Sequence, residues 1–353
     1  EYISGEVKLA LTLRILAVAS YLDMYLWLNI NADYCKIISK KVMREWICQD
    51  EVIEIYFYKN VLHNTRNCER ISAEFGEKSD GILGGCIGAL DGWLVKINCP
   101  YLSEVSNPGK YCSRKGFFAL NVQVIVDRNK RVLWRYIGEK GSAHDSPTFH
   151  ESDLGQYLLK CKDVMSRTGY YLIGDFAYAL RNYNLTPYDN ATHKSPEDTF
   201  NYFLSSSRIW VECAFGEVDR RWGCFWGRLE GRLENHRYTI DSAMRLHNFI
   251  VDHRESMKVS NHVDEVEMER RFEPELDEDC DDFLENNPFA TVGVFNEDVN
   301  IRARDRPTCA EAVARLEGKR LRDRIRDELI SNGYIRSDNM SVQNRNKYNR
   351  PCE

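Results

Sequence analysis

Three acidic residues of this sequence stand beside apolar segments, where an unpartnered charge is unfavourable. Asp175 ends the apolar run YYLIG, Asp91 interrupts the nearly continuous apolar stretch CIGALDGWLVKI, and Glu212 flanks a helical apolar stripe. A carboxylate in such surroundings loses hydration, and a bound cation would offset that loss. Clustered carboxylate oxygens select Mg²⁺ or Mn²⁺ over zinc. Two such ions can activate a water or a 3′-hydroxyl group and stabilise the leaving oxygen at a phosphodiester.

Each acid on its own also has a simpler explanation. A single Asp at the end of a strand is more often a cap or turn residue than a metal ligand. A phosphatase with an aspartate nucleophile is another chemistry for Asp91, but it needs a second acid two residues later, where this sequence has Trp93. The elements that carry the three acids therefore decide whether they can act together.

The apolar patterns around the acids predict an α/β domain. We expect the second and third strands to form a hairpin through the turn at 128–130 and to pair antiparallel with the first strand. A crossover helix should follow, with Ser146 as its N-cap and Pro147 at its first position, and lead to a fourth strand parallel to the first. The predicted strands cover residues 86–97, 117–127, 131–139 and 170–175.

A long amphipathic helix follows the fourth strand, and Glu212 lies at the flank of its apolar stripe. It can therefore face the sheet without entering the core. The order strand, hairpin, helix, strand, helix is that of a ribonuclease-H-like mixed sheet with flanking helices, in which three acids far apart in sequence can converge. The stripe repeats at helical spacing and consists of Val211, Ala214, Phe215, Val218 and Trp222.

Outside this α/β domain the chain changes composition. Residues 5 to about 50 show helical spacing and predict a small bundle, with a DNA-binding helix-turn-helix as the alternative. We expect its core face to hold Leu9, Leu13, Leu16 and Ala17. The predicted organisation is an N-terminal helical region (1–80), the α/β domain (84–255), an acidic linker (256–306) and a basic C-terminal helix with a tail (307–353).

Composition limits the classes of protein that this chain can belong to. The twelve cysteines stand singly, without a CxxC pair, so we expect reduced thiols rather than zinc fingers or a disulfide framework. No apolar run is long enough to span a membrane. The net charge of −6 is uneven, because residues 264–285 alone carry −10 while residues 302–326 carry +5. Because the chain begins with Glu1 rather than Met, we expect it to be a fragment.

Six short motifs follow one another along the chain. They are GALDG, SRKGFFALNVQVIVD, GSAHDSPTF, LIGDFAY, RIWVECAFGEVDRRWG and AMRLHNFIV. Together they resemble the DDE transposases of the Harbinger family, including domesticated relatives of these enzymes. The resemblance covers roughly residues 5–255, and the helix sequence LRDRIRDEL near the C-terminus also fits it.

The resemblance implies a ribonuclease-H-like nuclease whose catalytic and metal-binding acids are Asp91, Asp175 and Glu212. It implies Mg²⁺ or Mn²⁺ as cofactor, with two ions, and DNA as substrate, cleaved and transferred at transposon ends in the nucleus. It also implies a separate Myb-like DNA-binding partner protein; whether the chain forms a homo-oligomer stays open. The alternative function is a domesticated, catalytically silent DNA-binding or scaffold protein, although the three acids favour the enzyme.

Several further residues are candidates for supporting roles. His144 and Asp145 precede the crossover helix and either hold its first turn or support the metal site. Phe176 is larger than the family pattern leads us to expect after the second acid, so it should crowd the site slightly. Arg114, Lys115, Arg220 and Arg221 are candidate DNA-phosphate contacts, with a solvated surface as the alternative.

The basic C-terminal helix is a candidate contact surface for DNA or for a partner protein. Its positive charge would release counterions from phosphate groups, so the affinity should fall with salt. The alternative is a helix that packs on the core through Ala312, Leu316 and Leu321.

Overall fold

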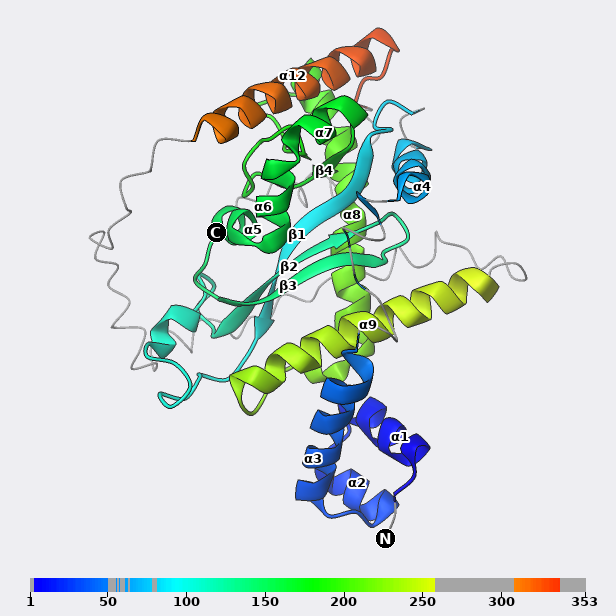
Figure 1. Ribbon diagram of the computed structural model, residues 1–353, viewed down its shortest axis with the longest axis vertical. Coiled ribbons are helices and arrows are strands. Elements are labelled where there is room, and N and C mark those ends of the chain that lie inside the picture. Colours follow the sequence, from blue (N-terminus) through cyan, green and yellow to red (C-terminus); the bar gives the residue numbers. More distant parts are fainter. Residues whose placement is uncertain are drawn as a thin grey trace.

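The structure is a computed structural model that describes residues 3–49, 55, 57, 61–62, 64–77, 81–257 and 308–336. Its centre is a five-stranded mixed sheet in the order β3-β2-β1-β4-β5 (Figure 1). This confirms the predicted α/β class. The strands are β1 (Cys86–Lys96), β2 (Ala119–Val126), β3 (Val132–Lys140), β4 (Tyr171–Ile173) and β5 (Asn184–Leu185).

The hairpin pairs as the two apolar runs and the turn between them predict. β2 lies antiparallel to β1, with Asp91 opposite Val124, and β3 lies antiparallel to β2. β4 lies parallel to β1, and their pairing ends with Ala89 opposite Ile173. Asp91 therefore lies two residues after the last residue of β1 that pairs with β4. Asp175 likewise lies two residues after the last residue of β4 that pairs with β1. The two acids therefore come from adjacent parallel strands, Asp91 from within β1 and Asp175 from just after β4, although the register of the two strands shifts between Cys86 and Ala89.

The crossover between β3 and β4 consists of three short helices instead of the single helix that we expected. They are α5 (Asp145–Glu151), α6 (Asp153–Lys160) and α7 (Lys162–Thr168). The break between the first two lies at Ser152, whose hydroxyl accepts a hydrogen bond from Gly155 N at 3.1 Å and so caps α6.

The predicted N-cap of the crossover was wrong by two positions. His144 is the N-cap of α5, and Pro147 is its third residue rather than its first. Proline is accepted there because an amide in the first helical turn has no partner within the helix. Ser146 instead accepts a hydrogen bond from Ala179 N at 3.1 Å, which ties α5 to the segment after Asp175.

Two long helices flank the sheet, α8 (Pro196–Arg221) and α9 (Leu233–Met257). α8 packs on β1 and β2, while α9 packs on β3 (Figure 1). The predicted stripe on α8 is confirmed, since four of its members are buried and Phe215 is half-buried. In α9, His247 and Asn248 are buried and bind the hairpin backbone at Lys130 O and at Val132.

The first three helices of the chain lie at one end of the molecule, below α9 in Figure 1, whereas the fourth packs against β1. The expected core face of α1 was only partly right: Leu16 is buried and Leu13 half-buried, but Leu9 and Ala17 are exposed. Leu11 and Thr12 take their place in the core. The helices are α1 (Gly5–Leu16), α2 (Tyr21–Leu28), α3 (Ala32–Val42) and α4 (Thr65–Gly76), with a π-helical turn at Met43–Ile47.

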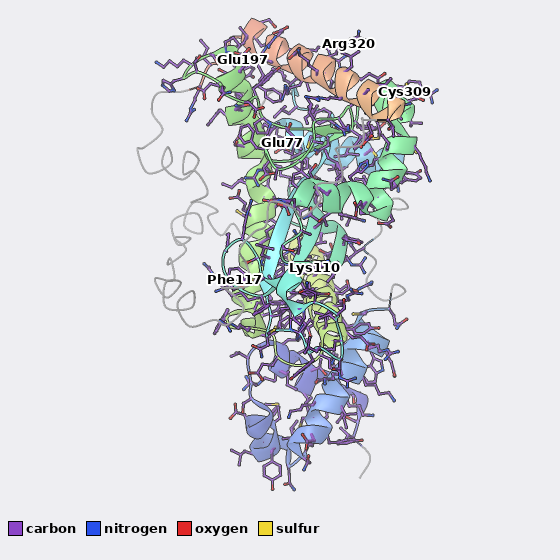
Figure 2. All side chains as sticks on the ribbon, turned by 90° about the vertical axis from the view of Figure 1, so that its left-hand side faces the viewer. Glu77, Lys110, Phe117, Glu197, Cys309 and Arg320 are labelled. Atoms are coloured by element: carbon purple, nitrogen blue, oxygen red, sulfur yellow. The ribbon has the colours of Figure 1, made fainter. Side chains whose placement is uncertain are left out.

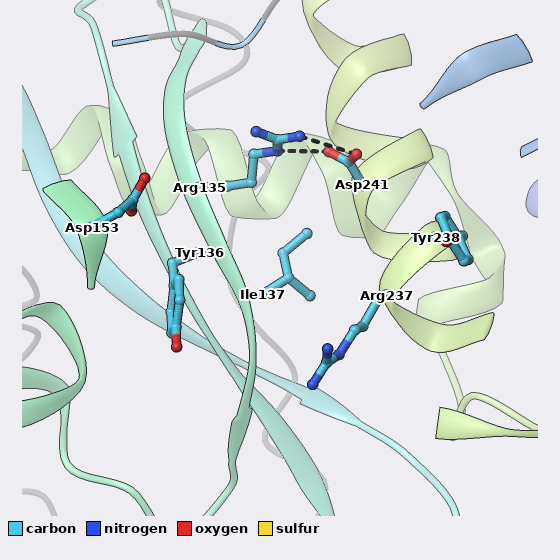
Figure 3. A pocket seen from close by; sticks show the side chains of 7 residues that line it. All are labelled: Arg135, Tyr136, Ile137, Asp153, Arg237, Tyr238 and Asp241. Atoms are coloured by element: carbon cyan, nitrogen blue, oxygen red, sulfur yellow. Dashed lines mark hydrogen bonds and ion pairs between the residues drawn. The ribbon is translucent and has the colours of Figure 1, made fainter. Parts of the chain in front are cut away.

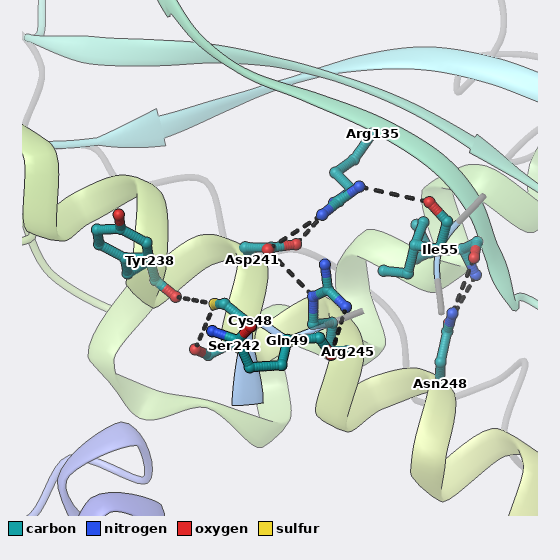
Figure 4. A network of polar contacts seen from close by, with 10 residues as sticks. Cys48, Gln49, Ile55, Arg135, Tyr238, Asp241, Ser242, Arg245 and Asn248 are labelled. Carbon is teal, nitrogen blue, oxygen red and sulfur yellow. Dashed lines mark hydrogen bonds and ion pairs between the residues drawn. The ribbon is translucent and has the colours of Figure 1, made fainter. Parts of the chain in front are cut away.

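A polar network ties this region to the sheet and to α9 (Figure 4). Asp241 of α9 accepts two hydrogen bonds from the Arg135 guanidinium of β3, at 2.6 and 3.1 Å. Arg245, one turn further along α9, donates to Asp241 and to the backbone oxygen of Gln49. The Cys48 sulfur lies 3.3 Å from the Ser242 hydroxyl. These contacts attach the π-helical turn and the residues that directly follow it to α9.

The C-terminal helix α12 (Cys309–Ser331) packs across α8, α6 and the edge strand β5. It lies at the end of the molecule opposite α1, α2 and α3 (Figures 1 and 2). The expected packing face was wrong in part, because Ala312 and Leu316 are exposed and Leu321 is only half-buried. The buried face is turned to the other side of the helix and consists of Ala314, Gly318, Ile325 and Leu329.

Some sequence-based expectations fall outside the described residues, among them almost all of the acidic linker at 256–306. The ten cysteines that the structure describes are all free thiols. None of the described helices is long and apolar enough to cross a membrane. Short 3₁₀ turns at Pro108–Tyr111 and Gly223–Phe225 complete the described elements.

A buried acid in the hairpin turn should make the stability of the protein pH-dependent. Burial raises the pKa of Asp127 from 3.8 to about 7, although its carboxylate accepts a hydrogen bond from Arg131 N. The folded state therefore binds this proton more tightly than the unfolded state, and stability should fall as pH rises from about 4 to 7. We expect Asp127→Asn, which keeps the accepting oxygen, to raise the unfolding free energy at pH 8 by on the order of 1–3 kcal/mol. Urea unfolding at pH 4 and pH 8 tests this, because the difference should vanish at pH 4.

Candidate functional site

Asp91 lies in the second half of β1, where its side chain is 19% exposed. One carboxylate oxygen accepts a hydrogen bond from Gly92 N at 2.8 Å. The other accepts from the guanidinium of Arg208 on α8 at 2.5 Å. Because α8 packs on β1, the acid in the strand meets a side chain of the helix.

Glu212 follows Arg208 by one helical turn on the same face of α8. The Arg208 guanidinium donates to Glu212 at 2.5 Å through its second terminal nitrogen. The Arg208 side chain is 16% exposed, whereas that of Glu212 is 45% exposed. A single guanidinium therefore bridges an acid of the strand and an acid of the helix.

Asp175 follows β4 in a tight turn that its own side chain closes. Its carboxylate accepts a hydrogen bond from Ala177 N at 2.8 Å, a local contact typical of aspartate in turns. Asp175 lies within electrostatic range of Asp91 and of Arg208. Phe176 follows directly, and its side chain is 60% exposed. The structure thus brings Asp91, Asp175 and Glu212 into one neighbourhood, around Arg208.

The electrostatics of this neighbourhood favour an additional cation. Burial raises the pKa of Asp91 to about 7; Arg208 opposes that rise, and the charges of Asp175 and Glu212 add to it. Burial also raises the pKa of Asp175. Burial disfavours the charged form of Arg208 itself, but the surrounding carboxylates outweigh this and raise its pKa. One guanidinium therefore does not neutralise all the carboxylates around it.

A fourth acid, Asp145, approaches β1 from the side of α5. One of its oxygens accepts hydrogen bonds from the amides of Asn121 at 3.0 Å and Gln123 at 2.8 Å, both buried on β2. The Tyr178 hydroxyl donates in turn to the Gln123 oxygen at 2.5 Å. Asp145 also raises the pKa of Asp175 by its charge. These contacts fix Asp145 beside the other acids, and its supporting role at a metal site stays a prediction.

Sequence reasoning missed the residues that hold these acids in place. Arg208 stands in the quoted helix motif, one turn before Glu212, but a pairing across to the sheet has no sequence signal. Asn121 and Gln123 did leave a signal, because two amides interrupt an otherwise apolar strand. Buried amides require hydrogen-bond partners, which indicates a polar network beneath that strand.

Gly92 leaves the space that Asp145 occupies, which leads to a stability prediction. A Cβ atom at position 92 would lie 2.4 Å from the Asp145 oxygen and 2.9 Å from the Gln123 amide nitrogen. We expect Gly92→Ala to displace Asp145, leave buried amides unpaired and lower the unfolding free energy by about 1–3 kcal/mol. Gly227→Ala is the matched control, since a Cβ there meets no atom within 4 Å. Equal denaturation midpoints for both variants would contradict this role of Gly92.

The candidate phosphate contacts differ in their surroundings. Arg114 and Lys115 are exposed, and Arg114 lowers the pKa of Asp175 through its charge, so it lies near the acids. Arg220 is exposed at the end of α8. Arg221 instead lies 3.9 Å from Glu217 and 3.4 Å from His247, within the packing of α8 on α9. His144 is exposed at the start of α5.

The acids have the donor chemistry of a Mg²⁺ or Mn²⁺ site, because all are hard carboxylate oxygens. Among the described residues no three acidic, histidine or cysteine side chains are close enough to hold a metal ion as they stand. Between Asp91 and Glu212 lies a guanidinium instead. These carboxylate oxygens therefore suit a divalent ion. To bind Asp91 and Glu212 together, the ion would have to take the position of the Arg208 guanidinium.

A separate hollow of about 420 Å³ opens between β3 and α9 (Figure 3). Its wall includes Arg135, Tyr136 and Arg237, with Asp241 bound to Arg135. β2 separates β3 from β1, so this hollow is not part of the acidic neighbourhood.

Comparison with known proteins finds similarity to one protein family and to one curated relative. Residues 90–248 match the family model described as DDE superfamily endonuclease. The chain is 28% identical to Protein ALP1-like of Arabidopsis thaliana over 197 residues, which are 52% of this chain and 47% of that protein. It thus spans about half the length of this relative. No solved structure matches the chain. With Asp91, Asp175 and Glu212 all inside the matched segment, the chain is a relative of the Harbinger-type DDE transposases and carries a DDE superfamily endonuclease segment.

Proposed function

We propose that the protein is a metal-dependent DNA endonuclease that cleaves and transfers strands at transposon ends. Its core would be a ribonuclease-H-like nuclease domain at 84–255, between an N-terminal helical region at 1–80 and the segments 256–306 and 307–353. The observation that carries the proposal is that Asp91 of β1 and Glu212 of α8 share the half-buried Arg208 guanidinium, while Asp175, just after β4, acts on the same guanidinium electrostatically.

In this proposal each acid has a distinct position. Asp91 and Glu212 would hold divalent ions between β1 and α8, and Asp175 would do so from the turn after β4. Bound Mg²⁺ or Mn²⁺, with two ions, would supply activation of the attacking water or 3′-hydroxyl and stabilisation of the leaving oxygen. Asp145, fixed by Asn121 and Gln123, would orient the edge of the site beside Asp175.

DNA would reach the acids across basic side chains that lie at the surface. Arg114 and Lys115 are the nearest candidates, because Arg114 already acts on Asp175 electrostatically. The outer face of α12 offers a second basic surface, made of Arg315, Lys319, Arg320 and Arg324, all exposed. Phosphate contacts of this kind weaken as salt rises. The work of such an enzyme is nuclear, together with a Myb-like DNA-binding partner.

A cleavage assay tests the proposed function directly. Labelled duplexes that carry transposon ends would be incubated with the protein and Mg²⁺, with and without the Myb-like partner. We expect strand nicks at the transposon ends that disappear with a chelator. Binding without cleavage under every condition would favour the alternative, a domesticated DNA-binding or scaffold protein that no longer acts as an enzyme.

A further inference from the structure

The Arg208 bridge uses the same carboxylate oxygens that a divalent ion would need. One terminal nitrogen of the guanidinium lies 2.5 Å from Asp91 Oδ2, and the other lies 2.5 Å from Glu212 Oε1. The remaining oxygen of Asp91 already accepts a hydrogen bond from Gly92 N. The guanidinium thus occupies the space between Asp91 Oδ2 and Glu212 Oε1, and a second cation that binds both oxygens there is repelled by its charge unless Arg208 withdraws.

The contact that can be released is the one to the arginine side chain. The Gly92 amide belongs to the backbone of β1 and cannot move away without disrupting the strand. Arg208 is held by a long side chain with several rotatable bonds, and its planar fork binds carboxylates as a replaceable cation. The Glu212 side chain is 45% exposed, so water can replace the guanidinium on this acid when Arg208 withdraws.

We propose that Arg208 is an internal counter-cation that holds Asp91 and Glu212 together before loading and competes with the divalent ion for both acids. This inference rests on the proposed function of the same site. Arg208 is then a positioning residue that sets the affinity of the site for metal. The guanidinium leaves the two oxygens when an ion binds, so the Arg208 bridge and the loaded site exclude each other.

Mn²⁺ binding without DNA tests this competition by calorimetric titration of the full chain. In Arg208→Gln the competing charge is gone, and we expect Mn²⁺ to bind roughly 10-fold more tightly or better. That factor follows from losing a charge-assisted hydrogen bond of about 1.5–3 kcal/mol. Arg208→Lys keeps the charge without the fork that reaches both acids, so its Mn²⁺ affinity should lie between those of the wild type and Arg208→Gln.

Thermal unfolding gives a second measurement that also reports on folding. Without metal, Arg208→Gln should melt at a lower temperature than the wild type, because two carboxylates then face each other without the guanidinium. Saturating Mn²⁺ should raise its melting temperature by more than that of the wild type, since tighter binding to the folded state stabilises it more.

Arg135→Gln is the matched control. Arg135 and Asp241 form a fork-like pair whose side chains are 20% and 15% exposed, close to the 16% and 19% of Arg208 and Asp91. This pair lies on β3 and α9, away from the acids. Arg135→Gln should therefore lower the melting temperature as well, but leave the Mn²⁺ affinity unchanged.

The outcomes separate the two proposals. If Glu212→Gln loses Mn²⁺ binding while folded Arg208→Gln and Arg208→Lys bind it no more tightly than the wild type, the counter-cation is refuted and the metal site stands. If no variant and no wild-type sample binds Mn²⁺, the proposed function fails and the inference with it. Should Arg208→Gln not fold, the comparison of Arg208→Lys with the wild type decides.

Discussion

The Glu212→Gln protein should fold normally and fail to nick DNA. Replacing one carboxylate by an amide removes a charged metal ligand, and we expect the nicking rate to fall by at least roughly 100- to 1000-fold, the range found when a charge-stabilising group is removed. The unfolding free energy should change little, because the Glu212 side chain is 45% exposed and Arg208 keeps its contact with Asp91. A nicking assay with Mg²⁺ and urea unfolding on the same preparation measure both quantities.

Glu217→Gln is the control for this result, because Glu217 lies on the same helix but pairs with Lys130 of the hairpin turn. It binds Lys130 at 2.7 Å, and this contact outweighs burial and lowers the pKa of Glu217. Its replacement should lower the stability and leave the nicking rate within a few-fold of the wild type. Asp91→Asn and Asp175→Asn should behave like Glu212→Gln. Wild-type nicking by Glu212→Gln would end the assignment of this acid to the metal site.

The Gly318→Ala protein should lose the docking of its C-terminal helix. A Cβ atom at position 318 would lie 2.4 Å from the backbone carbon of Arg181 and 2.6 Å from its oxygen, and backbone cannot step aside as a side chain can. The substitution would lower the unfolding free energy by about 1–3 kcal/mol, although alanine favours a helix more than glycine does. The bond from Asn182 N to Ala314 O, 2.8 Å long, should open with it.

Ala312→Gly separates docking from helix propensity. Ala312 is exposed, so its replacement weakens the helix by about 1 kcal/mol without touching the packed face. Hydrogen exchange should show faster exchange in β5 for Gly318→Ala, since α12 covers that edge strand, and little change there for Ala312→Gly. Unchanged exchange in β5 of Gly318→Ala would mean that α12 adjusts and stays in place. Truncation before Pro307 would remove α12 altogether and uncover β5, so it should destabilise the core. Charge substitutions on the exposed face of α12 are therefore the better test of DNA contact.

The acidic site could be found from the sequence because each acid interrupts a strong local pattern. The apolar strand that carries Asp91 and the apolar stripe on α8 follow from local sequence patterns, and they place Asp91 and Glu212 on elements that pack together. The resemblance to Harbinger transposases added the roles of the acids. The sequence did not fix where α5 begins. Because none of the amides in the first helical turn has a partner within the helix, Pro147 fits at the third position of α5 as well as at the first.

The sequence by itself determined the mixed α/β sheet, the hairpin and the three elements that carry the acids, because side-chain periodicity within one segment decides strand or helix. Only the tertiary structure decided that Arg208 lies between Asp91 and Glu212, and that Asp145 is fixed through a space left by Gly92. The tertiary structure also turned α12 so that Gly318, and not Leu316, faces the sheet edge. The contact between Arg208 and Asp91 joins residues 117 positions apart, and which cation or backbone meets a side chain at such a separation depends on how whole elements pack.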